Sequence, residues 1–218
     1  TQLITVIDDD VDTLRNSSSR LRVGSTLTRE ELLHLALMSS ENRAAAALAR
    51  TYPAGRAAFI KAMNRKAHDL GMTNSRFYDS TGLDGHNSST AEDLAKMVYA
   101  AYQYSTIREF STGQERIVTV NGKTKDFPVV FHNTNMLIYN KDWQIGLSKT
   151  GYINEAGRCL VMQTTIQNEP IIIVLLDSTG KYSRIGDANR IRKWIEIGAP
   201  QQIGVGANNG YINRDHSG

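Results

Sequence analysis

The chain is poor in the residues that build covalent scaffolds: its 218 residues include one cysteine, Cys159, and four prolines. A single cysteine excludes an intrachain disulfide and a zinc site built on several cysteines. Cys159 is therefore interpreted as a small buried side chain within a strand.

Long apolar stretches are also missing. A run such as Ile171–Leu176 is far shorter than the roughly 20 apolar residues of a membrane-spanning helix, and no N-terminal stretch has the layout of a signal peptide.

Charge is nearly balanced, with 25 Lys and Arg against 22 Asp and Glu and a net charge of +3. The basic residues are spread along the chain, so we expect no nucleic acid partner. The acidic run Asp8–Asp12 lacks the glycine and glutamate of an EF-hand loop, and we interpret it as a solvated turn and helix start. We expect no metal and no cofactor, because no paired ligand spacing occurs among the histidines: His34, His68, His86, His132 and His216.

The first half of the chain has the periodicity of helices, after a short candidate strand at Leu3–Ile7. Thr28 and Glu31 form a capping box ahead of a leucine-rich helix, which Ser39 and Ser40 interrupt. Three more helices are predicted: an alanine-rich one at Glu41–Tyr52, one at Ala54–Leu70 that Gly71 ends, and one that Thr90 and Asp93 open.

The second half changes to the periodicity of strands. Ile117–Val120, Asn121-Gly122 and Lys123–Phe127 predict a hairpin with a type I′ turn. Three antiparallel strands are expected at Gln144–Gly151, Arg158–Gln167 and Pro170–Asp177, joined by short turns. A final helix covers this sheet with an inner stripe of Ile185, Ala188, Ile191, Trp194 and Ile195, and Trp143 and Trp194 are interpreted as packing residues. The tail 199–218 is polar and glycine-rich.

Two short motifs stand where side chains can reach a cleft. Ser40-Glu41-Asn42 lies at the break between two predicted helices, and Lys149-Thr150-Gly151 ends a predicted strand. Each is weak alone. Together, in this order and on these elements, they resemble the second and third signatures of the penicillin-recognising serine hydrolases.

The resemblance extends over much of the chain, including Leu35–Leu48, Ala62–Leu83, His132–Asn135 and Leu147–Cys159. It identifies a low-molecular-mass penicillin-binding protein, most similar to the D-alanyl-D-alanine endopeptidases of the penicillin-binding protein 7/8 type. The resemblance implies an α+β, β-lactamase/transpeptidase-like fold. Residues 1–198 then form an incomplete domain, with a helical lobe (about 28–105) packed on an antiparallel sheet lobe (about 115–198), without the family's N-terminal strands and nucleophile helix.

The family's nucleophile, a serine in Ser-x-x-Lys, precedes the Ser-x-Asn motif, and no such motif stands there in this sequence. The one Ser-x-x-Lys is Ser178 to Lys181, after the last predicted strand, and we do not expect it to act. The resemblance assigns proton traffic and substrate orientation to Ser40 and Lys149 as catalytic residues. Asn42 is implied to hold a substrate amide, Lys149 and Thr150 a carboxylate, and His132 to brace the cleft. Gly151 lets the substrate backbone lie close, and the Tyr152 N–H is one oxyanion donor.

The resemblance implies a serine D-Ala-D-Ala endopeptidase or carboxypeptidase of the periplasm, with peptidoglycan peptide stems and β-lactams as ligands. This chain alone is expected to be inactive without the nucleophile. Two alternatives stay open: a non-catalytic fragment that binds wall peptide or a partner, and a class A β-lactamase. The latter is disfavoured because Ser75–Leu83 contains no glutamate to activate water, and Asp79 is its one acid. The last strand is expected to pair with the upstream segment or with another copy.

Overall fold

The computed structural model describes residues 2–121 and 125–198. Its centre is an antiparallel sheet of β5 (Gln144–Ile153), β6 (Gly157–Ile166) and β7 (Glu169–Ser178), in that order. The three strands confirm the predicted ones to within two residues at each end. Pro170 pairs with Thr165 at the start of β7. Because proline has no backbone N–H, this position avoids the loss of a hydrogen bond inside the sheet.

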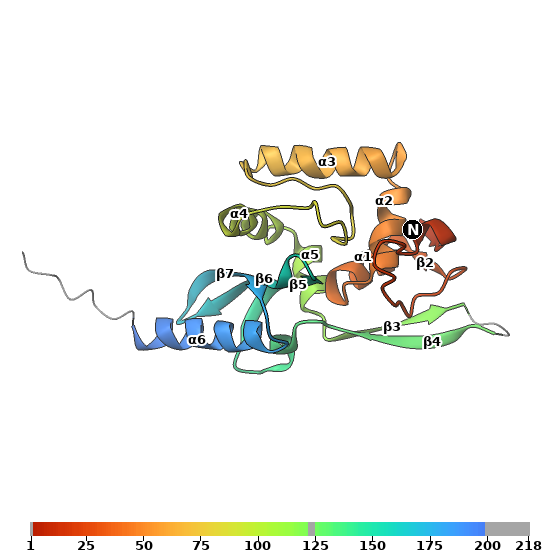
Figure 1. Cartoon of the computed structure of the whole chain (residues 1–218). Coiled ribbons are helices and arrows are strands. Elements are labelled where there is room, and N and C mark those ends of the chain that lie inside the picture. The colour runs from red at the N-terminus through yellow and green to blue at the C-terminus, as the bar shows by residue number, and fades with distance from the viewer. Residues whose placement is uncertain (1, 122–124, 199–218) are drawn as a thin grey trace, which may run out of the picture.

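Helices cover both faces of this sheet (Figure 1). α6 (Ser183–Ile197) packs on one face, while α4 (Ala91–Ala101) and α5 (Ser105–Thr112) pack on the other. Side chains of β6 alternate between these layers: Leu160 and Met162 join the cluster beneath α6, whereas Val161 joins Val98 of α4. The result is the expected α+β fold.

The helices α1 (Arg29–Met38), α2 (Asn42–Arg50) and α3 (Gly55–Asp69) follow a small sheet of β1 (Leu3–Thr5) and β2 (Thr26–Thr28). The capping box of Thr28 and Glu31 is confirmed, since each side chain bonds the other's backbone N–H. Gly71 follows α3 with a φ of +70°, the left-handed conformation that ends many helices. The small sheet, α1, α2 and the hairpin of β3 (Glu115–Val120) and β4 (Phe127–His132) enclose one core.

Four sequence predictions about the fold are wrong. α5 was not expected, and β4 begins at Phe127 instead of occupying Lys123–Phe127, because Val120 pairs with Phe127. The predicted Asn121-Gly122 turn lies partly, and the tail 199–218 wholly, outside the described residues. Trp194 is 53% exposed, and Cys159 is only partly buried. Trp143, by contrast, packs in the core under α6. None of the described helices has the length and hydropathy needed to cross a membrane.

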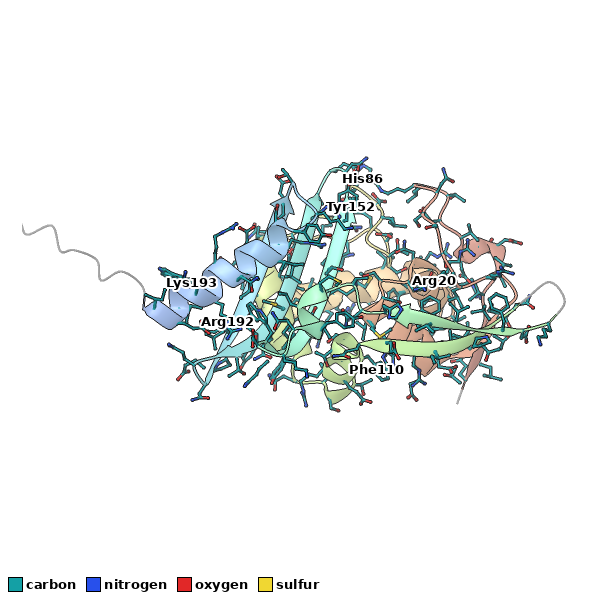
Figure 2. The ribbon with its side chains drawn as sticks, turned by 90° about the horizontal axis from the view of Figure 1, so that it is seen from below. Arg20, His86, Phe110, Tyr152, Arg192 and Lys193 are labelled. Atoms are coloured by element: carbon teal, nitrogen blue, oxygen red, sulfur yellow. The ribbon has the colours of Figure 1, made fainter. Side chains whose placement is uncertain are left out.

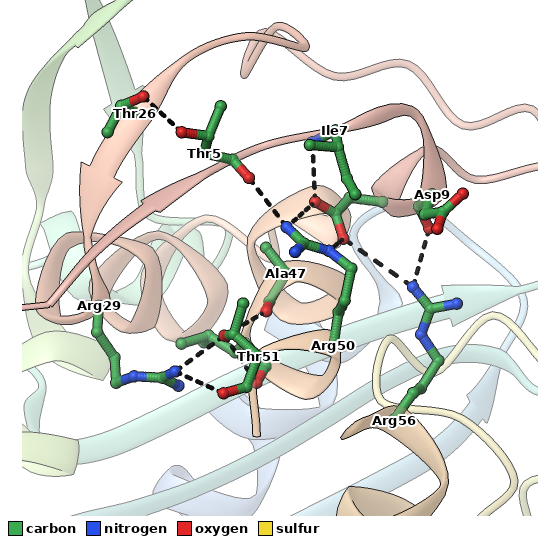
Figure 3. Close-up of polar contacts among 11 residues, drawn as sticks. Thr5, Ile7, Asp9, Thr26, Arg29, Ala47, Arg50, Thr51 and Arg56 are labelled. Carbon is green, nitrogen blue, oxygen red and sulfur yellow. Dashed lines mark hydrogen bonds and ion pairs between the residues drawn. The ribbon is translucent and has the colours of Figure 1, made fainter. Parts of the chain in front are cut away.

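The acidic run contains the expected helix start, since Asp8–Asp10 form a 3-10 helix, η1. It is not solvated throughout, because the side chain of Asp10 is fully buried. Arg50 of α2 binds this carboxylate with two hydrogen bonds of 2.8 Å, and the Ile7 N–H donates a third at 3.0 Å (Figure 3). Arg56 Nη2 lies 3.9 Å from Asp10 Oδ1. This buried ion pair joins the N-terminal segment to the helices.

We expect Arg50→Ala to lower the free energy of unfolding by about 3–5 kcal/mol, because it leaves the Asp10 charge buried without its partner. Asp10→Asn in the Arg50→Ala background should recover part of this loss, since it removes the unpaired charge. Urea unfolding at pH 7 measures both effects. The matched control is Arg190→Ala, which breaks an ion pair with Asp187 whose side chains are 73% and 36% exposed. Equal losses in Arg50→Ala and Arg190→Ala would contradict the role of the buried pair.

Candidate active site

The break between α1 and α2 shapes one wall of the site. Ser40 has a φ of +54°, a left-handed conformation that no helix can continue through. The Ser39 hydroxyl donates to the Leu35 carbonyl at 2.8 Å, and the Glu41 N–H donates to the same carbonyl at 3.2 Å. The Glu41 carboxylate then caps α2 by accepting from the Arg43 N–H. The chain therefore turns sharply at Ser40 and directs it and Asn42 to the cleft.

Glu41, the middle residue of the motif, points away from the cleft and is 8% exposed. Its burial raises the pKa of the carboxyl group, opposed by hydrogen bonds that include one from the Ser19 hydroxyl at 2.6 Å. Arg43 reaches the Leu21 carbonyl at 3.0 Å. Glu41 thus ties the motif to the segment before β2, which keeps the Ser40 turn in place.

The second motif lies opposite, on β5. The Lys149 ammonium donates to the Ser40 hydroxyl and, at 2.8 Å, to the Thr150 carbonyl. Burial and, to a smaller extent, the nearby Arg184 guanidinium together lower the pKa of Lys149 to about 8. An amine with a pKa this close to neutrality can take up and release protons under physiological conditions. The structure therefore brings together two residues that are 109 positions apart in the sequence.

Two asparagines hold the start of β5 against α5. Asn133 donates to the carbonyls of Ser111 (2.9 Å) and Gly113 (2.8 Å), and its own carbonyl accepts from the Asn135 N–H at 2.9 Å. Asn135 in turn donates to the Ser148 hydroxyl, beside Lys149, at 2.9 Å. The prediction that His132 braces the cleft is wrong. Its side chain is 57% exposed and lies 3.8 Å from Glu115, because β4 turns it outward.

The remaining predicted residues lie along the same strand and across from it. The Thr150 hydroxyl donates to that of Thr134 at 2.6 Å, and Asn42 donates to the Ser17 hydroxyl at 3.0 Å. A Cβ placed on Gly151 would meet only the Cys159 Cβ, at 3.9 Å, so the surface in front of this glycine is open. Tyr152 is 54% exposed and is the last residue of β5 that lines the cleft. Figure 2 shows it near the end of its strand.

All six predicted site residues line one cleft of about 580 Å³. Its other side is formed by α3, α4 and the loop between them, with an apolar part of Met63, Phe77, Met97 and Leu83. Ser178 and Lys181 do not line it. Among the described residues, no cluster of three His, Cys, Asp or Glu side chains could hold a metal ion.

Sequence reasoning gave no role to two residues of this cleft. Arg184, in the first turn of α6, donates to the Cys159 carbonyl at 2.7 Å and the Gly151 carbonyl at 3.3 Å. No motif marks it, since only the fold brings α6 to β5. Asp79 organises the loop wall. Burial alone would raise the pKa of its carboxyl group, but hydrogen bonds from Thr81 and Asn87 outweigh burial and lower the pKa. Asp79 before Thr81-Gly82 is a turn signal that the sequence does carry.

Helices packed on an antiparallel sheet, with Ser-x-Asn and Lys-Thr-Gly motifs facing each other across a cleft, define a protein of the β-lactamase-like fold. The sequence profile of the D-alanyl-D-alanine carboxypeptidases, peptidase family S11, matches residues 1–180, and the chain belongs to this family.

Individual relatives agree with this assignment. The chain is 47% identical over 214 residues to a D-alanyl-D-alanine endopeptidase of Pseudomonas aeruginosa, covering 98% of this chain and 68% of the relative. It is 51% identical over 189 residues to the D-alanyl-D-alanine endopeptidase of Escherichia coli K12, covering 87% and 60%. The chain thus spans about two thirds of the length of these relatives. The predicted resemblance to the endopeptidase branch is confirmed.

The fold resembles the crystal structure of the Streptomyces K15 DD-transpeptidase, with a TM-score of 0.79 and 31% identity. The superposition covers 88% of this chain and 78% of that one. The predicted β-lactamase/transpeptidase-like fold is therefore confirmed. The individual roles of the site residues, and the division into two lobes, stay predictions.

The lowered pKa of Lys149 has a measurable consequence. Because the folded chain holds this proton less tightly than the unfolded chain, the free energy of unfolding should rise with pH between about 8 and 10.5. The slope is at most about 1.4 kcal/mol per pH unit, and Lys149→Met should abolish it. Lysine side-chain NMR should show one amine, that of Lys149, titrating near pH 8. Arg184→Gln should raise the pKa of Lys149, whereas Arg192→Gln should not. A Lys149 pKa near 10.5 would contradict its burial.

Proposed function

We propose that this cleft serves a serine D,D-peptidase that cleaves D-Ala-D-Ala-type bonds in the peptide stems of peptidoglycan, as an endopeptidase or carboxypeptidase, through an acyl-enzyme. The observation that carries the proposal is the contact of Lys149 with Ser40 across a cleft bounded by the open edge of β5. The names of the relatives support the substrate class. Because peptidoglycan lies outside the inner membrane, the proposed location is the periplasm.

The edge of β5 suits an extended peptide. In the described part of the sheet β5 pairs on one side only, with β6, so a substrate backbone can add to its other side as a further strand. The open surface at Gly151 leaves room for that backbone. The Tyr152 N–H then acts as one donor to the oxyanion that forms when the carbonyl is attacked.

Charge and hydrogen-bonding groups fix the ends of the scissile bond. The Thr150 hydroxyl and the cations Lys149 and Arg184 bind the carboxylate on the leaving side, because all three line the cleft there. Asn42 binds an amide of the acyl side, since its side chain donates and accepts at once. Lys149 and Ser40 pass the proton to the leaving amine, and the pKa of Lys149, about 8, suits that transfer.

The proposed nucleophile is a serine of a Ser-x-x-Lys motif contributed from outside these 218 residues. Ser178, the one serine here in that pattern, lies at the end of β7 and does not line the cleft. We further propose that the outer edge of β7 pairs with the segment that carries the nucleophile or with another copy of the chain, since β7 is the other edge strand of the described sheet.

The alternative of a class A β-lactamase is disfavoured by the state of Asp79. Its two carboxylate oxygens accept hydrogen bonds from the N–H groups of Thr81, Gly82 and Leu83 and from the side chain of Asn87. A carboxylate so fully engaged in holding its own loop is a poor base for activating water. The alternative of a non-catalytic fragment that binds wall peptide applies to the 218-residue chain alone.

The 218-residue chain should not be acylated by penicillin, whereas a chain extended upstream through the Ser-x-x-Lys helix should gain one penicilloyl adduct. The reason is that no serine in this cleft has both a neighbouring base and the position of the nucleophile. Mass spectrometry after incubation with a penicillin measures both. A stoichiometric adduct on the short chain, mapped to Ser40 or Ser178, would show that the nucleophile is assigned wrongly.

In the extended chain, Lys149→Ala should slow acylation on the order of 10²-fold or more, because it removes both a charge and a proton carrier. Thr150→Ala should have a smaller effect, since one neutral hydrogen bond contributes about 1 kcal/mol. Stopped-flow acylation by a fluorescent penicillin gives both rates. Acylation of Lys149→Ala at the rate of the parent would refute this role.

A further inference from the structure

The segment between η1 and β2 contains a turn that no predicted role includes. Asp12 folds it: one carboxylate oxygen accepts from the N–H groups of Leu14 (2.9 Å) and Arg15 (3.1 Å), and the other accepts from the Ser17 N–H (2.8 Å). These bonds lower the pKa of Asp12, although burial alone would raise it. We call residues 12–17 the bridging turn.

The bridging turn contacts two parts of the cleft wall and the turn that follows β5. Arg15 Nε donates to the Leu83 carbonyl at 2.6 Å, and Arg15 Nη2 binds Glu155 Oε1 at 2.9 Å. The Ser17 hydroxyl accepts from Asn42 at 3.0 Å. Leu83 belongs to the loop wall, Glu155 to the turn between β5 and β6, and Asn42 to the helical wall. One short segment therefore joins all three.

The Arg15–Glu155 pair lies at the end of the cleft beyond Tyr152. Leu83 and Tyr152 both line the cleft, and Glu155 is in the turn that follows β5. The loop at Gly85 lies close to the Arg15–Glu155 pair. A Cβ on Gly85 would come within 3.4 Å of both Arg15 Nη2 and Glu155 Oε1. Figure 2 shows Tyr152 and His86 of this loop at the same edge of the molecule. A peptide that runs along β5 from Lys149 past Tyr152 meets these groups.

Stability does not explain this arrangement. The side chains of Arg15 and Glu155 are 25% and 55% exposed, and ion pairs that solvent reaches contribute little to folding. The bond from Arg15 to Leu83 is different, since it is short, charge-assisted and directed by the planar guanidinium. Its effect is to fix the position of one backbone segment relative to another.

We propose that Arg15 is a positioning residue for this end of the cleft. It holds the loop Leu83–Gly85 and the β5–β6 turn at a fixed spacing, so that both contact the part of a bound peptide that extends beyond Tyr152. That the ligand is a peptide rests on the proposed function. That Arg15 fixes the spacing of the loop and the turn does not.

The chain offers a matched control in Arg192 of α6. Arg192 binds Glu196 at 2.7 Å and the Asp142 carbonyl at 2.6 Å, with side chains of Arg192 and Glu196 that are 28% and 40% exposed. Like Arg15, it bonds one carboxylate and one backbone carbonyl. Neither of its partners lines the cleft, whereas Leu83, a partner of Arg15, does. Any general effect of removing such an arginine should therefore appear in Arg192→Ala as well.

The spacing is tested in the 218-residue chain by amide hydrogen exchange. The N–H groups of Leu83 and Asn87 bond within the loop, so their exchange reports its opening. Arg15→Ala should speed the exchange of both N–H groups about five- to tenfold, whereas Arg192→Ala should leave it unchanged. Arg15→Lys keeps the charge but lacks the forked guanidinium, so its effect should be intermediate. Unchanged exchange in Arg15→Ala, or the same change in Arg192→Ala, overturns the proposal.

The effect on binding is tested in the extended chain with a three-residue and a five-residue peptide, both ending in D-Ala-D-Ala. Arg15→Ala should raise KM for the five-residue peptide about fivefold and leave kcat for that peptide unchanged. Neither KM nor kcat for the three-residue peptide should change. Equal changes for both peptides, or none, overturn the positioning of substrate. If the unmodified extended chain forms no penicillin adduct and cleaves neither peptide, the proposed function fails, and the exchange experiment still decides whether Arg15 fixes the spacing.

Discussion

The site depends on one backbone constraint, the left-handed residue between α1 and α2. If Ser40 had helical dihedral angles, α1 and α2 would be a single helix and no side chain of the Ser-x-Asn motif would meet β5. A left-handed serine is unfavourable on its own, so its neighbours must hold it. Ser39 and Glu41 do so by using the same Leu35 carbonyl, and the buried Glu41 anchors the turn to Ser19. The middle residue of the motif thus maintains the geometry that the outer two use.

The facing wall is fixed by different means. β5 is an edge strand in the described sheet and pairs with no strand on its cleft side, and a side-chain amide holds it instead through the Ser148 hydroxyl. Asn133 and Asn135 form a buried chain of hydrogen bonds from α5 to Ser148, and every amide group of that chain has a partner. A fully satisfied buried network of this kind is rigid. The Lys149 side chain therefore starts from a fixed backbone and crosses to a fixed Ser40.

The sequence predicted the elements whose signals are local. Thr28 with Glu31, Gly71, and the alternation of β5 to β7 are short-range patterns, and the structure has them where they were expected. Several of the errors concern long-range partners. Asp10 is buried because Arg50 reaches it from another helix, and Trp194 is exposed because four aliphatic residues already cover the sheet face of α6. Similarly, the site motifs could be read from the sequence, but Arg184 could not, since only the packing of α6 on the sheet brings it to Gly151.

Arg184 resolves a conflict in the proposed chemistry. A substrate carboxylate next to Lys149 favours the charged amine and so opposes its use as a proton acceptor. A cation that cannot lose its proton is better suited to hold the carboxylate, and Arg184 is such a group. Its positive charge also keeps the pKa of Lys149 low before the substrate binds. In the proposed reaction, the two cations therefore have different roles. The guanidinium supplies the permanent charge that binds the carboxylate, and the partly buried amine, in contact with Ser40, remains free to exchange a proton.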